Sequence, residues 1–428
     1  MRISKAGAGM CGALLLAAIA PVNAGSVDAK LLDMLKANGA ITAAQHAELS
    51  ADLAREASEE KLAAKTQVSE KDFFEFKELA GWAANTRLKG DMRVRHGYVN
   101  IEDENKDAGR DKDQQRIRAR LGAFTQVNPE IEAGIQVASG NSTDRRSSNQ
   151  DLDNYFDKKS IWLDLAYIDY HPAAVPGLKG FAGKMKQPWV AVADMAWDTD
   201  INPEGFAASY SRKFGSTTLF GSTGYFIVKD NVDAEGVEWQ HDLSLTALQI
   251  GASFDASEEL RIMLGGSVNS FSNDKYGSTS SFRTSGNTTD KFGLYELFGQ
   301  VDVNGLPLPL SVYGQYIRNV EAEDFGVYQD GDQDTAWLVG LRTNIDDFSI
   351  DYNYRDVQNN AVVGGFTDSD FAAGFTGSSG HKLQLKYEFL KNFSGGVTYF
   401  NTEADAVSRS KPDDAQVDVI QIDLNARF

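Results

Sequence analysis

Hydrophobic and polar residues alternate along most of the chain, from about Leu88 to Phe428. The alternating segments are about 10–14 residues long and end at turn-forming residues, as expected for strands that cross a membrane. Successive side chains of a strand point to opposite faces, so each segment predicts one apolar and one polar face. Sixteen segments fit this pattern. They lie near 88–99, 115–127, 131–140, 160–170, 178–186, 205–213, 216–228, 242–254, 259–272, 292–303, 308–320, 335–345, 347–357, 381–390, 394–403 and 416–428.

The connections between these segments alternate between short turns, such as Phe214-Gly215 and Asp346-Asp347, and long polar loops. Short periplasmic turns and long external loops are typical of outer-membrane barrels. In lipid, only a closed barrel pairs every backbone N–H and C=O of a set of strands. We therefore predict an all-β transmembrane antiparallel barrel of about sixteen strands over residues 83–428. The long loops span 101–114, 141–159, 187–204, 229–241, 273–291, 321–334, 358–380 and 404–415.

The last segment carries a specific pattern at the carboxyl terminus. Ala426, Leu424 and Ile422 occupy alternate positions behind the terminal Phe428. An aromatic residue at this position resembles the signal that the barrel assembly machinery of the outer membrane reads, so we expect that machinery as a partner. Aromatic residues near strand ends favour the girdles at the two membrane interfaces. The candidates are Tyr98, Tyr170, Tyr225, Phe389, Phe393, Tyr399 and Phe400.

Residues 1–24 have the composition of a secretory signal peptide. Arg2 and Lys5 precede an apolar run over 10–20, and small residues follow as far as Ala24. The run is too short to span a bilayer, which needs roughly 20 apolar residues. Cys11 lies at the start of the run rather than after it, which argues against a lipid anchor. We expect cleavage near Ala24 and export to the outer membrane of a Gram-negative cell.

Residues 25–82 predict a short periplasmic helix–turn–helix. The helical pattern runs from Val27 to about Gln67. Gly39 is placed to end the first helix, and Thr42 and Gln45 form a capping box that begins the second. Because so short a segment is not stable alone, we expect it to pack on the barrel or on a partner chain. A coiled coil remains an alternative, although the heptads are irregular.

Charge and rare residues exclude several classes of protein. The net charge is −19, which disfavours nucleic acid as a partner. Cys11 is the only cysteine, and the five histidines are scattered, so we expect no enzyme activity, metal or cofactor. The acidic segment 330–334 lacks the glycine that a calcium-binding loop has at its sixth position, so we predict a solvated loop. Divalent cations bridging acidic loops to lipopolysaccharide remain an alternative.

Basic residues gather on one face of neighbouring segments. A lipid-facing arginine costs about 2–4 kcal/mol at the bilayer midplane, so these residues must face the lumen. They form a basic ladder made of Arg93 and Arg95, then Arg116, Arg118 and Arg120, with Lys184 and Lys186 nearby.

The loop after the fifth segment is acidic and carries Asp194, Asp198, Asp200 and Glu204. One hypothesis is that this loop folds into the lumen and faces the ladder, which would create a transverse field. The alternative is that the arginines pair with other lumen carboxylates and the loop stays outside.

Several short motifs resemble the Putative porin family of Gram-negative bacteria. These motifs are Leu88–Arg93, Gln115–Leu121, Leu165–Tyr170, Gly183–Pro188 and Trp197–Gly205. The resemblance implies a passive channel for small hydrophilic solutes in contact with outer-membrane lipid and lipopolysaccharide. It names no solute, and comparison with phosphate-selective porins leaves that specificity open. By analogy with sixteen-stranded porins we expect a homotrimer.

Three other functions fit a chain of this pattern less well than a channel does. A structural anchor or adhesin would use the N-terminal helices to grip a partner, but it would not require a charged lumen. An enzyme is disfavoured because no nucleophile and base can be brought together from the sequence. An active importer would need a folded N-terminal plug larger than the helical segment.

Overall fold

The computed structural model describes residues 25–103, 110–230, 242–274, 282, 286–324, 331–405 and 414–428. The expected signal peptide therefore lies outside the described residues. The chain divides into two compact units, up to Trp82 and from Ala83 to Phe428.

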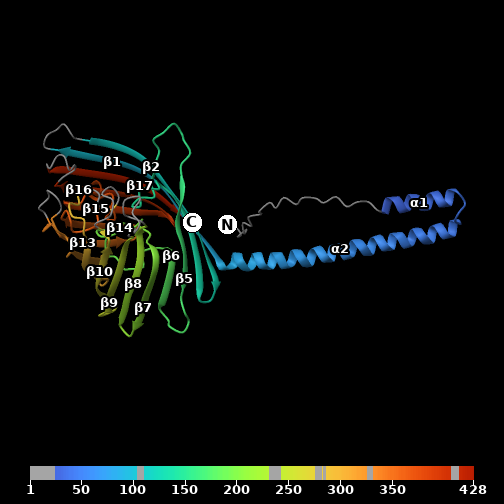
Figure 1. The fold of residues 1–428 in the computed structure, drawn as a ribbon, viewed down its shortest axis with the longest axis horizontal. Coiled ribbons are helices and arrows are strands. Elements are labelled where there is room, and N and C mark those ends of the chain that lie inside the picture. The colour runs from blue at the N-terminus through green and yellow to red at the C-terminus, as the bar shows by residue number, and fades with distance from the viewer. Residues whose placement is uncertain are drawn as a thin grey trace, which may run out of the picture. The chain divides into compact units, whose positions relative to one another are not determined.

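The second unit is a closed antiparallel barrel in which each strand pairs with its neighbours in the sequence (Figure 1). Pairing of the first strand with the last closes it, with Met92 opposite Ala426. The predicted sixteen-stranded barrel is confirmed. Its wall consists of β1 (Thr86–Asp103), β2 (Arg110–Asn128), β3 (Ile131–Ser139), β5 (Ile161–Tyr170), β6 (Leu178–Lys184), β7 (Glu204–Phe214), β8 (Thr217–Lys229), β9 (Leu243–Asp255), β10 (Leu260–Ser272), β11 (Gly293–Val303), β12 (Leu310–Asn319), β13 (Thr335–Ile345), β14 (Phe348–Val357), β15 (Ser378–Leu390), β16 (Phe393–Ala404) and β17 (Ala415–Arg427).

The alternation along each strand sorts the side chains between lipid and lumen. In β9, Leu248 and Ile250 are exposed on the outside, whereas Gln249 between them is buried inside. An outer apolar face and a polar interior are what a bilayer requires of a barrel. Most predicted girdle aromatics are also exposed, including Tyr170 and Tyr225. Phe400 is an exception, because it is 1% exposed and packs against Phe371 inside the barrel.

Two of the long loops fold inward and pack against the inner wall of the barrel. The third loop (residues 185–203) joins β6 to β7, and the seventh loop (residues 358–377) joins β14 to β15. Their aromatic side chains meet, since the rings of Trp197 and Phe366 lie 5.4 Å apart and that of Phe271 from β10 stacks on both. The core of this unit therefore lies between the loops and the inner wall. The two-residue strand β4 (Gln150–Asp151) belongs to the second loop (residues 140–160) and pairs with β2.

The N-terminal unit contains α1 (Gly25–Ala37) and α2 (Ala43–Asn85). Gly39 has a φ of +69°, which fits its predicted place after the first helix, and the Thr42 hydroxyl accepts a hydrogen bond from the Gln45 N–H at 3.3 Å. The prediction that the second helix ends near Gln67 was wrong. Residues 68–85 contain no proline and are rich in helix formers, so the helix continues to the first strand. No helix among the described residues is long and apolar enough to cross a membrane.

Candidate functional site

The basic ladder lies on the inner wall formed by β17, β1 and β2. Arg93 stands opposite Arg118 in the strand register, and Arg95 stands opposite both Arg116 and Asp423. The two strands therefore bring together the arginines that the sequence placed on one face. Like charges opposite each other are unfavourable, so the wall needs counter-charges.

Carboxylates supply these counter-charges for four of the five arginines. Asp91 lies opposite Arg120 and accepts hydrogen bonds from both Arg118, at 2.9 Å, and Arg120, at 2.7 Å. Arg95 pairs with Asp423 at 2.7 Å and with Asp370 of the seventh loop at 3.0 Å. Arg116 pairs with Asp151 at 2.8 Å. Arg93 differs, because it donates to the neutral amide oxygen of Asn149 at 2.6 Å.

The third loop lies inside the barrel, but its acidic residues have different partners. Asp200 meets the ladder, with its carboxylate 3.4 Å from Arg120, and also accepts hydrogen bonds from the backbone and hydroxyl of Ser148. Glu204 is the first residue of β7 and pairs with Lys184 at 2.7 Å. Lys186 donates to the Asn202 side chain at 2.9 Å.

Asp194 of the third loop pairs with two cations of the barrel wall instead of with the ladder. Arg355 of β14 pairs with it at 2.8 Å, and Lys382 of β15 pairs with it at 2.7 Å. Both cations also approach Asp368 of the seventh loop, at 3.5 and 3.4 Å. Arg355 is 1% exposed, and its guanidinium lies 4.5 Å from the centre of the Phe371 ring. These charges fasten both inward loops to one place on the wall.

Asp198 lies where the third and seventh loops meet. Its backbone N–H donates to the Phe366 carbonyl at 2.7 Å, and its carboxylate accepts from the Ser369 N–H at 3.1 Å. Burial, and after it the charge of Asp368, raises the pKa of the Asp198 carboxyl well above its ordinary value. Burial and the charge of Asp194 likewise raise the pKa of Asp368.

Asp200 behaves in the opposite way. Burial alone would raise the pKa of its carboxyl, but Arg118, the Ser148 N–H and Arg120 together outweigh burial and hold that pKa below its ordinary value. This carboxylate therefore stays charged beside the ladder over the physiological range.

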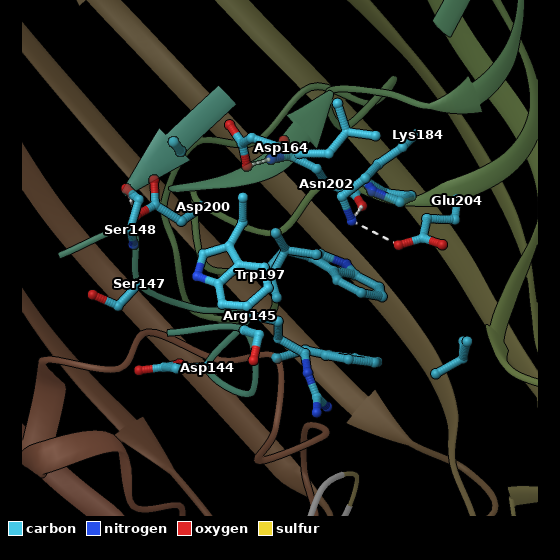
Figure 2. A pocket seen from close by; sticks show the side chains of 18 of the residues that line it. Asp144, Arg145, Ser147, Ser148, Asp164, Lys184, Trp197, Asp200, Asn202 and Glu204 are labelled. Carbon is cyan, nitrogen blue, oxygen red and sulfur yellow. Dashed lines mark hydrogen bonds and ion pairs between the residues drawn. The ribbon is translucent and has the colours of Figure 1, made fainter. Parts of the chain in front are cut away.

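Two of the cavities that the described residues line lie beside the charged groups of this site. One, of about 330 Å³, lies between the second and third loops and the wall. Trp197 lines it, together with Asp164, Asn202 and Lys184, as Figure 2 shows. The other, of about 590 Å³, lies along the ladder wall and is lined by β1, β2 and β17 and by the second and seventh loops. The second cavity is lined mainly by charged and polar side chains, whereas the first also has large apolar ones, including Trp197, Phe226 and Phe366.

A family model described as Putative porin matches residues 104–298 and 315–428. The chain belongs to this family. It is an outer-membrane porin, and so a channel rather than an enzyme.

The chain is also similar to solved porin structures. Salmonella typhi OmpF, in a complex with daunomycin, is 14% identical with a TM-score of 0.46, over 80% of this chain and 97% of that one. A multiple mutant of the Rh. blastica porin is 10% identical with a TM-score of 0.43, over 80% and 100%. A curated relative, Phosphate starvation-inducible protein 1 of Pseudomonas fluorescens, is 60% identical over 38 residues, 9% of this chain and 97% of that one.

Sequence reasoning missed the contribution of the seventh loop to the lumen of this porin. A signal for it was present, because residues 361–366 read Ala-Val-Val-Gly-Gly-Phe, which is unusually apolar for a loop in water. Alternation in β14 also puts Arg355 on the same face as Asn353 and Asp351, and therefore in the lumen. Pairing of Arg355 with the third loop, 161 positions away in the sequence, could not be read from local pattern.

Proposed function

We propose that this porin is a passive diffusion channel for small hydrophilic and ionic solutes, with a charged constriction between the basic ladder and the third loop. The observation that carries the proposal is the contact between Asp200 and Arg120 inside the barrel. Positive charge gathers on the β1–β2 wall, and the third loop supplies negative charge opposite it. Opposite charges across a narrow passage of low dielectric constant produce a transverse field that orients polar solutes.

Phosphate is the first solute to test. The name of the Pseudomonas fluorescens relative refers to induction by phosphate starvation. A lumen wall rich in arginine suits oxyanions, since the guanidinium group presents parallel N–H donors to two oxygens. Chloride and potassium give the reference for charge preference.

The test is conductance of the purified mature protein in a planar bilayer, with the reversal potential measured under a salt gradient. Stable open steps are expected. Anion preference that falls in Arg118→Ala or Arg120→Ala assigns the filter to the ladder, whereas cation preference assigns it to the acidic loops. Folded protein that gives no conductance would overturn the proposed channel. Arg261→Ala is the matched control, since Arg261 is exposed near a turn and pairs only with Asp255 among the described residues.

A further inference from the structure

Cations in the lumen of this porin differ in what neutralises them. One group pairs directly with carboxylates. In the described part of the chain, another group hydrogen-bonds only to neutral acceptors, and it consists of Arg93, Arg146 and Lys186. A partly buried cation without a counter-ion is unfavourable, so a site of this kind gains stability when an anion arrives. The carboxylate-paired group includes Arg95, Arg116, Arg118, Arg120, Lys184, Arg342, Arg355 and Lys382.

Arg93 lies beside two other arginines of the ladder. Arg95 follows it on the same face of β1, and Arg118 stands opposite it on β2. Its only hydrogen-bond acceptor among the described residues is Asn149, and its Nε atom is buried without an acceptor there. The carboxylates nearest in the register are engaged elsewhere, Asp91 with Arg118 and Asp423 with Arg95.

Arg146 projects from the second loop toward the seventh loop. Its guanidinium donates to the carbonyl oxygen of Gly364 at 2.9 Å and to that of Gly374 at 3.5 Å. These backbone carbonyls are neutral, so they orient the guanidinium without forming an ion pair with it. Asn149, which accepts the hydrogen bond from Arg93, is also neutral. Its side-chain nitrogen donates to the Ser147 hydroxyl at 3.0 Å.

Arg146 borders the 590 Å³ cavity along the ladder wall, whereas Arg93 is linked to it through the hydrogen bond that it donates to Asn149. Arg146, Ser147 and Asn149 line it directly. Gln114 also lines it, and is 8% exposed with a side-chain nitrogen that meets no acceptor in the described residues. Three of the acidic residues around the cavity are already paired, namely Asp151 with Arg116, Asp370 with Arg95 and Asp153 with Lys159. The fourth, Asp144, accepts a hydrogen bond from the backbone N–H of Arg146 rather than from its guanidinium.

We propose that Arg93 and Arg146, with Gln114 and Asn149, form a binding station for a small oxyanion such as phosphate, sulfate or a short carboxylate. The proposal rests on the proposed channel function and names the solute class that pauses in it. An oxyanion accepts several N–H bonds at once and supplies the missing negative charge, which a water molecule does not. The paired arginines of the ladder contribute to the field along the wall, and Arg93 and Arg146 bind the oxyanion directly.

The experiment measures block of chloride current through the full mature protein in a planar bilayer, with inorganic phosphate as the probe. Wild-type channels are expected to show a chloride current that falls and saturates as phosphate rises. Arg93→Gln and Arg146→Gln are each expected to raise the half-blocking concentration about tenfold, which corresponds to loss of one charge-assisted hydrogen bond. Arg93→Lys keeps the charge without the guanidinium fork. Its half-blocking concentration is expected to lie between those of wild type and Arg93→Gln.

Arg342→Gln is the matched control. Arg342 lies on β13 and pairs with Asp351 at 2.6 Å. Its replacement by glutamine removes one positive charge from the same lumen. Its half-blocking concentration is expected to stay within about twofold of wild type, because the residue lies outside the station. Circular dichroism and the gel mobility of unheated protein check that each variant folds. If a glutamine variant does not fold, the Arg93→Lys variant tests the station instead.

The outcomes separate the station from the channel. A conducting wild-type protein that phosphate does not block refutes the station and leaves the channel standing. Equal block in wild type and in both glutamine variants also refutes it, as does an equal loss in the Arg342→Gln control. Absence of any conductance refutes the channel and the station together.

Discussion

Arg355 holds both inward loops, and its replacement by methionine tests that arrangement most directly. Methionine fills a similar volume but removes the charge. The change breaks ion pairs to Asp194, at 2.8 Å, and to Asp368, at 3.5 Å, around a side chain that is 1% exposed. It also removes the contact with the Phe371 ring.

The loss of stability in Arg355→Met depends on the ion pairs that remain after the substitution. Breaking a buried ion pair by removing one partner costs about 3–5 kcal/mol, because the other charge is left uncompensated. Lys382 still reaches both carboxylates, at 2.7 and 3.4 Å, so the lower end applies. A loss of about 3 kcal/mol shifts the equilibrium between docked and released loops about 100-fold toward release.

Single-channel recording is the assay. Arg355→Met is expected to show larger and noisier open steps than wild type, since released loops widen the passage. Arg355→Lys, which keeps the charge, is the control and is expected to stay nearer to wild type. A double-mutant cycle that combines Arg355→Met with Asp194→Asn should show a stabilising coupling energy between the two residues. Open steps of unchanged size and noise in Arg355→Met would refute the view that this cation fastens the loops.

Three further predictions concern pH, the barrel seam and the helices. The raised pKa values of Asp198 and Asp368 mean that the contact between the loops is most stable below the ordinary carboxyl pKa and weakens as pH rises through the raised values. Current noise should therefore increase with pH in wild type, and Asp198→Asn, which mimics the protonated form, should flatten that dependence. A Cβ at Gly90 would lie 2.5 Å from the Phe428 ring and 2.9 Å from a backbone oxygen, so Gly90→Ala should cost about 1–3 kcal/mol and lower the temperature at which gel mobility shifts. Gly97→Ala is its control, because a Cβ there meets only one atom, at 3.9 Å. Deletion of residues 25–82 should leave single-channel conductance unchanged, since they form a separate compact unit; a changed conductance would assign them a part in the pore.

Local pattern alone was enough to determine the barrel and its two faces. The period of two in segments such as 88–99 selects strands, and a lipid environment then requires closure because no backbone group can remain unpaired. The cost of an arginine in lipid places Arg118 and Arg120 in the lumen without any structure. Turn and cap signals at Gly39 and Thr42 likewise act over a few residues, and the sequence displays them.

Only the tertiary structure decided which charges meet. Closure of the barrel brings Asp423 beside Arg95, 328 positions earlier, and loop folding brings Asp370 to the same guanidinium. Alternation shows that a side chain faces the lumen, but it says nothing of which loop enters the lumen or how far. The hypothesis that the third loop meets the ladder is represented among the described residues by the contact of Asp200 with Arg120, while Asp194 pairs with Arg355 and Lys382. Those pairings depend on three-dimensional packing between segments far apart in the chain, and therefore lie beyond any periodicity of the sequence.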